Sequence, residues 1–224
     1  MPRREWFRVW TACVIGAGLL VGAVAVPSVG AASKPNWVLV EDDDGIKVWS
    51  LDIPGQDLPG FRGITTINAT VDEVMEFVLD APKHVEWMWN CDESRIVERL
   101  SEDHGILYNR INAPWPVKDR DVLLDIVYRY TPQRTAVTFR FRETKEREWE
   151  EKVPVPRRVV RIPKLEGFFR IWQESPTKTN VLYQVEVDIG GNVPDMAARR
   201  YARKLPFETL EALREQVEAK KKKR

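Results

Sequence analysis

Five side chains that could support acid–base or nucleophilic chemistry lie within a short stretch: His84, Glu86, Cys91, Asp92 and His104. Catalysis by such groups needs a nucleophile, a base within hydrogen-bonding distance and a third group that orients the base. His84 and Glu86 are two residues apart in an expected helix, so they do not share a face. Cys91 and His104 could meet in space, but nothing in the sequence places them together or supplies an orienting third group. We therefore expect a binding protein rather than an enzyme, and keep catalysis on an apolar substrate as the alternative.

Neither the composition nor the motifs of the chain indicate a site for a metal, another cofactor or a nucleic acid. The chain has two His and two Cys without metal-ligand spacing. It has no glycine-rich phosphate loop. The formal net charge is only +1, and no basic stripe of the kind that binds nucleic acid is present. We expect no metal, no other cofactor and no nucleic-acid partner.

Apolar side chains that alternate with polar ones offer a different chemistry, the shielding of a lipid from water. Strict alternation is typical of antiparallel strands with one buried face. These side chains either fill a core or line an apolar sleeve, and burial of an acyl chain favours binding by about 0.8 kcal/mol per CH₂. The expected inward face contains Val122, Leu124, Ile126, Tyr128, Phe139, Phe141, Tyr183 and Val185.

Two polar residues share the parity of this face and could orient a ligand. Asn109 alternates in register with Leu107, which we also place on the inward face. Arg120 has the parity of the apolar residues that follow it. Because Arg120 lies between Asp119 and Asp121, a structural ion pair is its other interpretation.

Two further segments could meet a membrane. Trp115 lies between two prolines, which favour an extended and stiff loop; packing beneath the sheet edge is favoured over membrane contact for this side chain. The last expected helix carries Met196 and Leu205 on its apolar side and Arg200 among basic residues that suit anionic head groups. A solvated helix face is the equal alternative.

The elements that must position these residues follow from periodicity and capping signals. The segment from Thr70 to Glu73 forms a capping box, which predicts a helix start. Pro206 falls inside the last helix and should kink it. Further helices and strands alternate in an α+β order. Strands are expected at 37–40, 46–51, 61–69, 96–100, 106–111, 122–130, 137–142 and 181–189, and helices behind Thr70, at 81–89 and at 194–219.

The first 32 residues resemble a secretory signal. Three Arg precede an uncharged apolar run, Thr11–Val26, and small residues follow Pro27. The run is shorter than the roughly 20 residues that span a bilayer. We therefore expect a signal peptide at 1–32, cleaved near Ala31 or Ala32, a lipid-binding domain at 33–219 and a basic tail at 220–224. Export to a bacterial periplasm is the expected location. After cleavage only Cys91 remains, which excludes an intramolecular disulfide.

The order of several local motifs resembles the START (steroidogenic acute regulatory protein-related lipid transfer) family over about 37–217. The resembling pieces are Trp37, 44–48, 61–63, Glu86-Trp87, Tyr108, 114–121, Gly167, Trp172 and 188–194. Any one of these pieces is weak, and the resemblance depends on their shared order and spacing.

This resemblance implies a helix-grip fold of the α+β class, in which a curved antiparallel sheet wraps around a long C-terminal helix. Members bind one sterol, phospholipid or similar lipid in a tunnel, without a metal or redox cofactor, and the last helix acts as a gate. Trp172, one of the resembling residues, is expected to contact this ligand. The chain departs from the family at Met88, Leu107 and Ile126, where some members have charged residues. A monomer that touches membranes transiently is the state that the resemblance implies.

Overall fold

The computed structural model describes residues 35–222 except 57, 192 and 194; within the last helix, the side chains of 195–198 and 200–202 are outside the description. The signal peptide expected at 1–32 therefore lies outside the described residues, as does the expected helix start at Pro194. Within the described part, none of the helices combines the length and apolar character that crossing a membrane requires.

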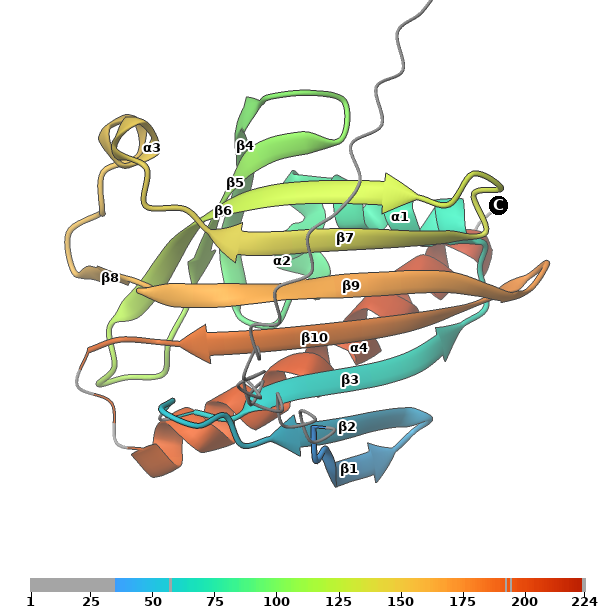
Figure 1. Ribbon diagram of the computed structural model, residues 1–224, viewed down its shortest axis with the longest axis horizontal. Coiled ribbons are helices and arrows are strands. Elements are labelled where there is room, and N and C mark those ends of the chain that lie inside the picture. The colour runs from blue at the N-terminus through green and yellow to red at the C-terminus, as the bar shows by residue number, and fades with distance from the viewer. Residues whose placement is uncertain (1–34, 57, 192, 194, 223–224) are drawn as a thin grey trace, which may run out of the picture. The chain divides into compact units, whose positions relative to one another are not determined.

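The described residues form one large sheet and a long C-terminal helix that lies on its inner face (Figure 1). The helical elements are α1 (Val71–Leu79), a 3₁₀ turn (Ala81–Lys83), α2 (His84–Trp87), α3 (Arg147–Lys152) and α4 (Asp195–Lys222). The strands are β1 (Val38–Asp43), β2 (Ile46–Leu51), β3 (Gly60–Ile67), β4 (Cys91–Arg99), β5 (His104–Ile111), β6 (Asp119–Tyr130), β7 (Ala136–Glu143), β8 (Val159–Arg161), β9 (Lys164–Ser175) and β10 (Lys178–Asp188).

The sheet order is β1-β2-β3-β10-β9-β7-β6-β5-β4, with β8 beside the start of β6. Within the described residues, the pairings are antiparallel apart from that of β8 with β6. The pairing of β3 with β10 joins segments that lie more than a hundred residues apart in the chain. Strands from both ends of the domain thus build one continuous wall around α4.

Local sequence explains the first helix. The Thr70 hydroxyl accepts a hydrogen bond from the Glu73 amide at 3.2 Å, and the Glu73 carboxylate accepts one from the Thr70 amide at 2.8 Å. The predicted capping box is therefore confirmed. Val71, Val74 and Met75 on the inner side of α1 are buried, because the helix lies against the same core as the sheet.

More side chains are buried on the outer face of the sheet than simple alternation of apolar and polar residues predicts. Leu123 of β6 and Tyr108 of β5 point outward yet are buried, together with Trp149 and Val153. The helix α3, which periodicity did not predict, supplies Trp149 and covers this second cluster. Strands β8 and β9 were not predicted either. In the segment that holds β9, glycine and charged residues interrupt the alternation of buried side chains.

The last helix is longer than predicted and is bound along its C-terminal half. It continues to Lys222, so Lys220 to Lys222 of the expected tail are helical. Lys220 pairs with Glu76 of α1 at 2.6 Å, and Glu218 accepts two hydrogen bonds from Asn68. Leu210, Leu213 and Val217 are buried against the sheet. The C-terminal half of α4 is thereby fixed to the domain.

Two glycines form the connection between β10 and α4. Gly190 and Gly191 have φ angles of +61° and +73°, which glycine adopts without the steric cost that a Cβ would bring. The Gly190 amide donates a hydrogen bond to the Asp188 carboxylate at 2.9 Å. This tight turn reverses the chain so that α4 runs back along the inner face of the sheet.

Candidate ligand-binding cavity

An apolar cavity of about 50 Å³ lies between the inner face of the sheet, α2 and α4. Its walls come from five strands of the sheet, from α1 and α2 with the residues that follow it, and from α4. The lining side chains are those of Val78, His84, Trp87, Met88, Trp89, Leu107, Asn109, Ile111, Val122, Leu124, Phe139, Phe141, Leu165, Phe169, Tyr183 and Leu205.

None of these sixteen lining residues is Asp, Glu, Lys or Arg. His84 is neutral at physiological pH, because burial lowers its pKa to about 4. Its ring nitrogens are 3.0 Å from the Val78 carbonyl oxygen and 3.1 Å from the Ser94 hydroxyl oxygen. Burial also raises the pKa of Tyr183 well above its ordinary value, so its hydroxyl stays protonated. The described residues of the cavity wall therefore carry no charge near neutral pH.

Aromatic rings from three neighbouring strands pack against one another in the wall of this cavity. Phe169 and Tyr183 stack with their centroids 4.4 Å apart, and Phe139 and Phe141 lie at 6.4 and 6.3 Å from Phe169. A Cβ at Gly167 would lie 2.6 Å from the Phe141 ring, so only glycine leaves room for that ring. Ligand pockets usually measure about 300–1,000 Å³. A lipid can enter only if these rings and α4 move.

A second small hollow, of about 30 Å³, shares part of the same wall. Val78, His84, Leu107 and Phe139 line both hollows. The rest of the second hollow differs from the first, because it includes the charged residues Arg99, Glu102 and Asp103.

Ten of the sixteen predicted ligand-binding residues line one of these two hollows. Eight line the first: Leu107, Asn109, Val122, Leu124, Phe139, Phe141, Tyr183 and Leu205. The second adds Ile126 and Tyr128. The strand parity read from the sequence thus places these residues on the inner face.

Two other predicted residues lie elsewhere in the sheet. Val185 is buried in the core but does not line the cavity. Trp172 has the parity of the exposed Arg170, opposite to that of Phe169 and Ile171, and it lies half-buried on the outer face. The expectation for Trp172 is therefore corrected, because in β9 the inward positions are the odd-numbered ones.

Arg120 is buried at the start of β6 but does not line the cavity. Its guanidinium donates hydrogen bonds to the carbonyl oxygens of Lys118 and, at 3.2 Å, Gly190. It thus holds the β5–β6 loop to the turn that precedes α4. The buried ion pair nearby joins Asp121 to Arg161 at 2.8 Å. Arg120 is therefore not among the described residues that line the cavity, in contrast to the expected ligand contact.

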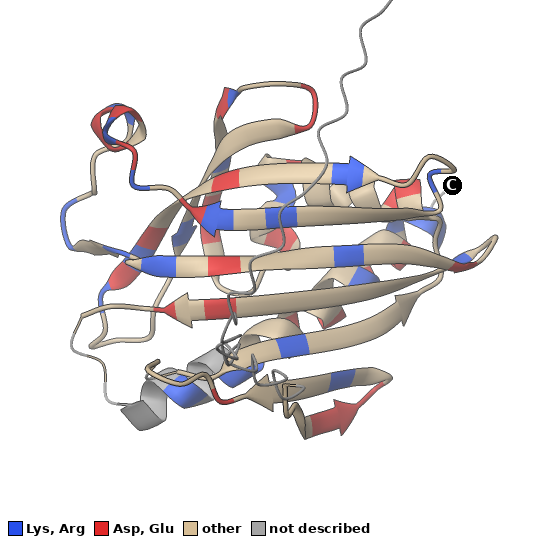
Figure 2. Cartoon of the chain, viewed as in Figure 1, with Lys and Arg blue, Asp and Glu red and all other residues tan. Residues whose placement is uncertain are grey.

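Trp115 is 92% exposed, so the favoured expectation that it packs beneath the sheet edge is wrong. Its loop is tied through Arg120 to Gly190, close to the beginning of α4. Arg199, Arg203 and Lys204 are exposed on the N-terminal part of that helix, where Figure 2 shows Lys and Arg together. The side chains of Met196 and Arg200 lie outside the described residues.

The N-terminal half of α4 closes the cavity with Leu205 and rests on β3 at Gly63. A Cβ at Gly63 would lie 2.7 Å from Leu210 Cδ1 and 3.1 Å from Pro206 Cβ. The glycine therefore permits the close approach of the helix. Arg203 donates to the Val40 carbonyl oxygen and lies 3.6 Å from a Glu41 carboxylate oxygen.

The candidate catalytic residues do not assemble. Cys91 and His104 lie at opposite ends of the β4–β5 hairpin, since Cys91 pairs with Ile111 and His104 begins β5. Burial raises the pKa of Cys91 to about 12, which suppresses the reactive thiolate. His104 contacts Asp125 at 2.9 Å on the surface. Of these candidates only His84 lines the cavity.

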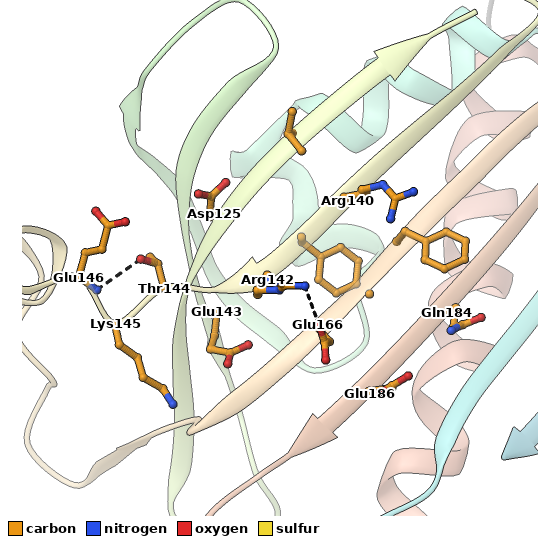
Figure 3. Close-up of a pocket in the computed structure, with 14 residues that line it drawn as sticks. Asp125, Arg140, Arg142, Glu143, Thr144, Lys145, Glu146, Glu166, Gln184 and Glu186 are labelled. Atoms are coloured by element: carbon orange, nitrogen blue, oxygen red, sulfur yellow. Dashed lines mark hydrogen bonds and ion pairs between the residues drawn. The ribbon is translucent and has the colours of Figure 1, made fainter. Parts of the chain in front are cut away.

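A larger hollow of about 720 Å³ lies on the outer face of the sheet (Figure 3). It is open and lined largely by charged side chains; Arg142, for example, lies 3.2 Å from Glu166. Residues of both signs surround it, namely Arg140, Arg142 and Lys145 with Asp125, Glu143, Glu146, Glu166 and Glu186. This surface suits water better than an apolar ligand, so we place the ligand site in the interior.

Sequence reasoning missed the contribution of α2 and β9 to the cavity. Trp87 and Met88 were noted only as parts of the family resemblance, and Phe169 was not singled out. A helix of four residues is too short to show a 3.6-residue period. The aromatic pair Phe168-Phe169 was the available signal for β9.

Comparisons with known proteins agree with this architecture. A family model described as polyketide cyclase / dehydrase and lipid transport matches residues 67–214. An uncharacterized protein of Pseudomonas aeruginosa is 30% identical over 189 residues, covering 84% of this chain and 90% of that protein.

Solved structures show the same fold. A STAR-related lipid transfer protein fragment from Xanthomonas axonopodis has a TM-score of 0.72 and 28% identity, covering 81% of this chain and 98% of that one. Human STARD10 has a TM-score of 0.71 and 17% identity, covering 81% and 72% of the two chains. The expected helix-grip fold, a curved antiparallel sheet around a C-terminal helix, is confirmed.

Proposed function

The chain belongs to the polyketide cyclase/dehydrase and lipid transport family, and we propose that it binds a single lipid or similar apolar molecule between its sheet and α4, for transfer or storage. The observation that carries the proposal is the cavity wall, whose described residues are uncharged and mostly aromatic or aliphatic. Such a wall stabilises an acyl or ring system removed from water.

Opening of the cavity is the step that binding requires. The C-terminal half of α4 is held by buried leucines and by an ion pair to α1, whereas Leu205 is the described cavity-lining residue of its N-terminal half. Pro206 stands between the two halves and removes a backbone hydrogen bond. The N-terminal half therefore moves as the gate, and the glycine pair Gly190-Gly191 absorbs the change in backbone direction.

The direct experiment is to extract the purified protein with organic solvent and to analyse the extract by mass spectrometry. One apolar molecule per chain is the expected result. Uptake of a fluorescent phospholipid or sterol from donor vesicles provides a second measurement. Absence of any extracted molecule, together with no uptake of either probe, would contradict the proposal and favour an interaction domain without a ligand.

We also propose that the protein is not an enzyme. Among the described lining residues, His84 and Tyr183 can titrate, and the altered pKa of each keeps it neutral. The support is the absence of a charged general acid or base from this wall. Ligand recovered unchanged after long incubation is the expected result, and a chemically modified product would instead support the enzyme alternative.

Membrane contact, export and a monomeric state are further parts of the proposal. Trp115 and the basic residues of α4 lie at the end of the domain where the gate begins, which suits delivery from a bilayer. The signal-like pattern of 1–32 supports export to a periplasm. N-terminal sequencing of exported protein should then give a chain that begins just after Ala31 or Ala32.

A further inference from the structure

Among the residues that the structure describes, two polar atoms of the cavity wall have no hydrogen-bond partner. Trp87 is 2% exposed and its indole N–H, at Nε1, is unpaired; Asn109 is 3% exposed and its carbonyl oxygen, at Oδ1, is unpaired. Both side chains line the same cavity. Buried polar groups are nearly always paired in folded proteins, so each such exception requires an explanation.

The nearest polar contact does not resolve the exception at Asn109. Its Nδ2 group lies 3.4 Å from the sulfur of Met88, which is a weak acceptor. Turning the amide over would leave an N–H group unpaired in place of the carbonyl oxygen. Either orientation thus leaves Asn109 with hydrogen-bonding capacity that the surrounding side chains do not meet.

The two unpaired atoms have opposite roles. The indole N–H can only donate, and the amide oxygen can only accept. A hydroxyl group is the smallest chemical group that accepts one hydrogen bond and donates another at the same atom. A pure hydrocarbon would leave both protein atoms buried and unpaired, which opposes its binding.

The lack of charge in the wall limits the ligand further. A carboxylate or phosphate inside the cavity would find no cationic partner among the lining residues that the structure describes, and burial of an unpaired charge is strongly unfavourable. His84 does not supply a cation, because its ring is neutral and faces Ser94 and Val78. The part of the ligand that enters the cavity must therefore be neutral.

We propose that the ligand is a neutral lipid alcohol, whose hydroxyl group accepts a hydrogen bond from Trp87 Nε1 and donates one to Asn109 Oδ1. This inference rests on the proposed function, because it assumes that the cavity opens to an apolar molecule. It assigns Trp87 and Asn109 as the residues that select the ligand class, and the aromatic wall as the part that accepts the hydrocarbon.

The test uses three probes with the same sixteen-carbon chain: hexadecan-1-ol, hexadecane and hexadecanoate. The full chain is incubated with phosphatidylcholine vesicles that contain equal amounts of all three, at pH 8. Protein is then separated from the vesicles by gel filtration, and the bound probes are quantified by mass spectrometry. We expect the wild-type protein to retain hexadecan-1-ol over either other probe by about tenfold or more, which corresponds to about 1.4 kcal/mol.

Two variants test whether Trp87 Nε1 and Asn109 Oδ1 cause the preference for the alcohol. Trp87→Phe removes the N–H donor and keeps an aromatic ring, and Asn109→Leu removes the amide at similar volume. Each should reduce the preference for alcohol over alkane several-fold, without loss of hexadecane binding. Leu123→Met, on the opposite face of β6 and outside the cavity, is the control and should keep the wild-type preference. Since the vesicles are the same throughout, differences between variants do not depend on how each probe partitions into the bilayer.

The outcomes separate this inference from the function on which it rests. If wild-type protein binds alcohol and alkane equally, the hydroxyl assignment is overturned while lipid binding stands. The same holds if the preference for alcohol survives in a variant that carries both Trp87→Phe and Asn109→Leu. If hexadecanoate is preferred, the neutral-ligand argument is overturned. If none of the probes binds and no molecule is extracted from the purified protein, the proposed function itself fails.

Discussion

At the scale of single residues, His84 connects the cavity to the stability of the fold. The imidazole is buried, and its two nitrogens lie within hydrogen-bonding distance of Val78 and Ser94, on α1 and β4. A neutral ring that donates to the carbonyl oxygen and accepts from the hydroxyl satisfies both contacts. The ring therefore joins elements on two sides of the cavity.

We expect the stability of the protein to fall as the pH falls below 6.5, with His84 as one cause. Burial lowers the pKa of this group from 6.5 to about 4, so the unfolded chain binds a proton before the folded chain does. The stabilisation that this lowered pKa provides is present above pH 6.5 and is lost toward pH 4. It amounts to about 3 kcal/mol. Urea unfolding between pH 7.5 and 4.5 measures it.

The variant His84→Gln provides the comparison for this titration. Gln keeps a donor and an acceptor but has no titratable group, so its free energy of unfolding should depend less steeply on pH in this range. Carboxylates contribute equally to both proteins. Equal pH dependence of the variant and the wild-type protein would exclude His84 as a cause.

At the scale of elements, the contact of α4 with β3 controls the closed state. Gly63 lies against Leu210 and Pro206. Because Gly63 has no side chain, the helix packs closer to the strand than it could against any other residue. The contact lies beside Pro206, a proline inside the helix that cannot donate a backbone hydrogen bond. A change at Gly63 therefore acts on the gate and not on the cavity wall.

The substitution Gly63→Ala should displace α4 from β3. The added methyl group would lie 2.7 Å from Leu210 Cδ1, so the helix must shift, at a cost of about 1–3 kcal/mol in the free energy of unfolding. We expect faster exchange of fluorescent lipid between vesicles and the protein. In the double variant Gly63→Ala, Leu210→Ala the clash is removed. The loss in its free energy of unfolding should therefore be smaller than the sum of the losses in the two single variants. Strict additivity would argue against this contact.

Linking α4 to the β1–β2 hairpin should stop exchange. Arg203 lies 3.6 Å from Glu41, so cysteines at these positions, joined by a reducible bis-maleimide, would hold the N-terminal half of the helix closed. The buried thiol of Cys91, with its raised pKa, should not compete for the reagent. We expect lipid exchange to be lost after linking and restored by reduction. Undiminished exchange in the linked protein would refute gating by α4.

At the scale of the whole molecule, the proposed membrane contact involves one end of the domain. The β5–β6 loop, with the exposed Trp115, is tied to the turn before α4, whose described N-terminal part carries exposed Arg and Lys. Elsewhere both signs of charge alternate over the strands, as Figure 2 shows. Orientation on an anionic surface is thus favoured with the gate toward the bilayer.

The substitution Trp115→Ala should weaken binding to anionic vesicles several-fold, because an indole ring is favoured at the membrane interface. Co-sedimentation with vesicles that contain phosphatidylglycerol, at low and high salt, measures the effect. Leu100→Ala is the matched control, since Leu100 is also exposed but lies at the other end of β5. A similar loss in both variants would contradict a specific role for the Trp115 loop.

Much of this fold could be predicted from the sequence because its determinants are local or periodic. The capping box at Thr70, the alternation in β6, β7 and β10, and the apolar stripe of the last helix all depend on spacing within one segment. The order of motifs identified the fold family. Strand parity also placed nine of the predicted ligand residues at the two hollows, and the apolar stripe of the last helix added Leu205.

Tertiary structure decided what spacing cannot encode. The pairing of β3 with β10, the cover that α3 gives to Leu123, and the attachment of Arg120 to Gly190 join residues far apart in the chain. The size of the cavity is likewise fixed by how rings from different strands stack, since interiors pack to a density that no single segment specifies. The unpaired atoms of Trp87 and Asn109, which point to the ligand, become visible only when their neighbours in space are known.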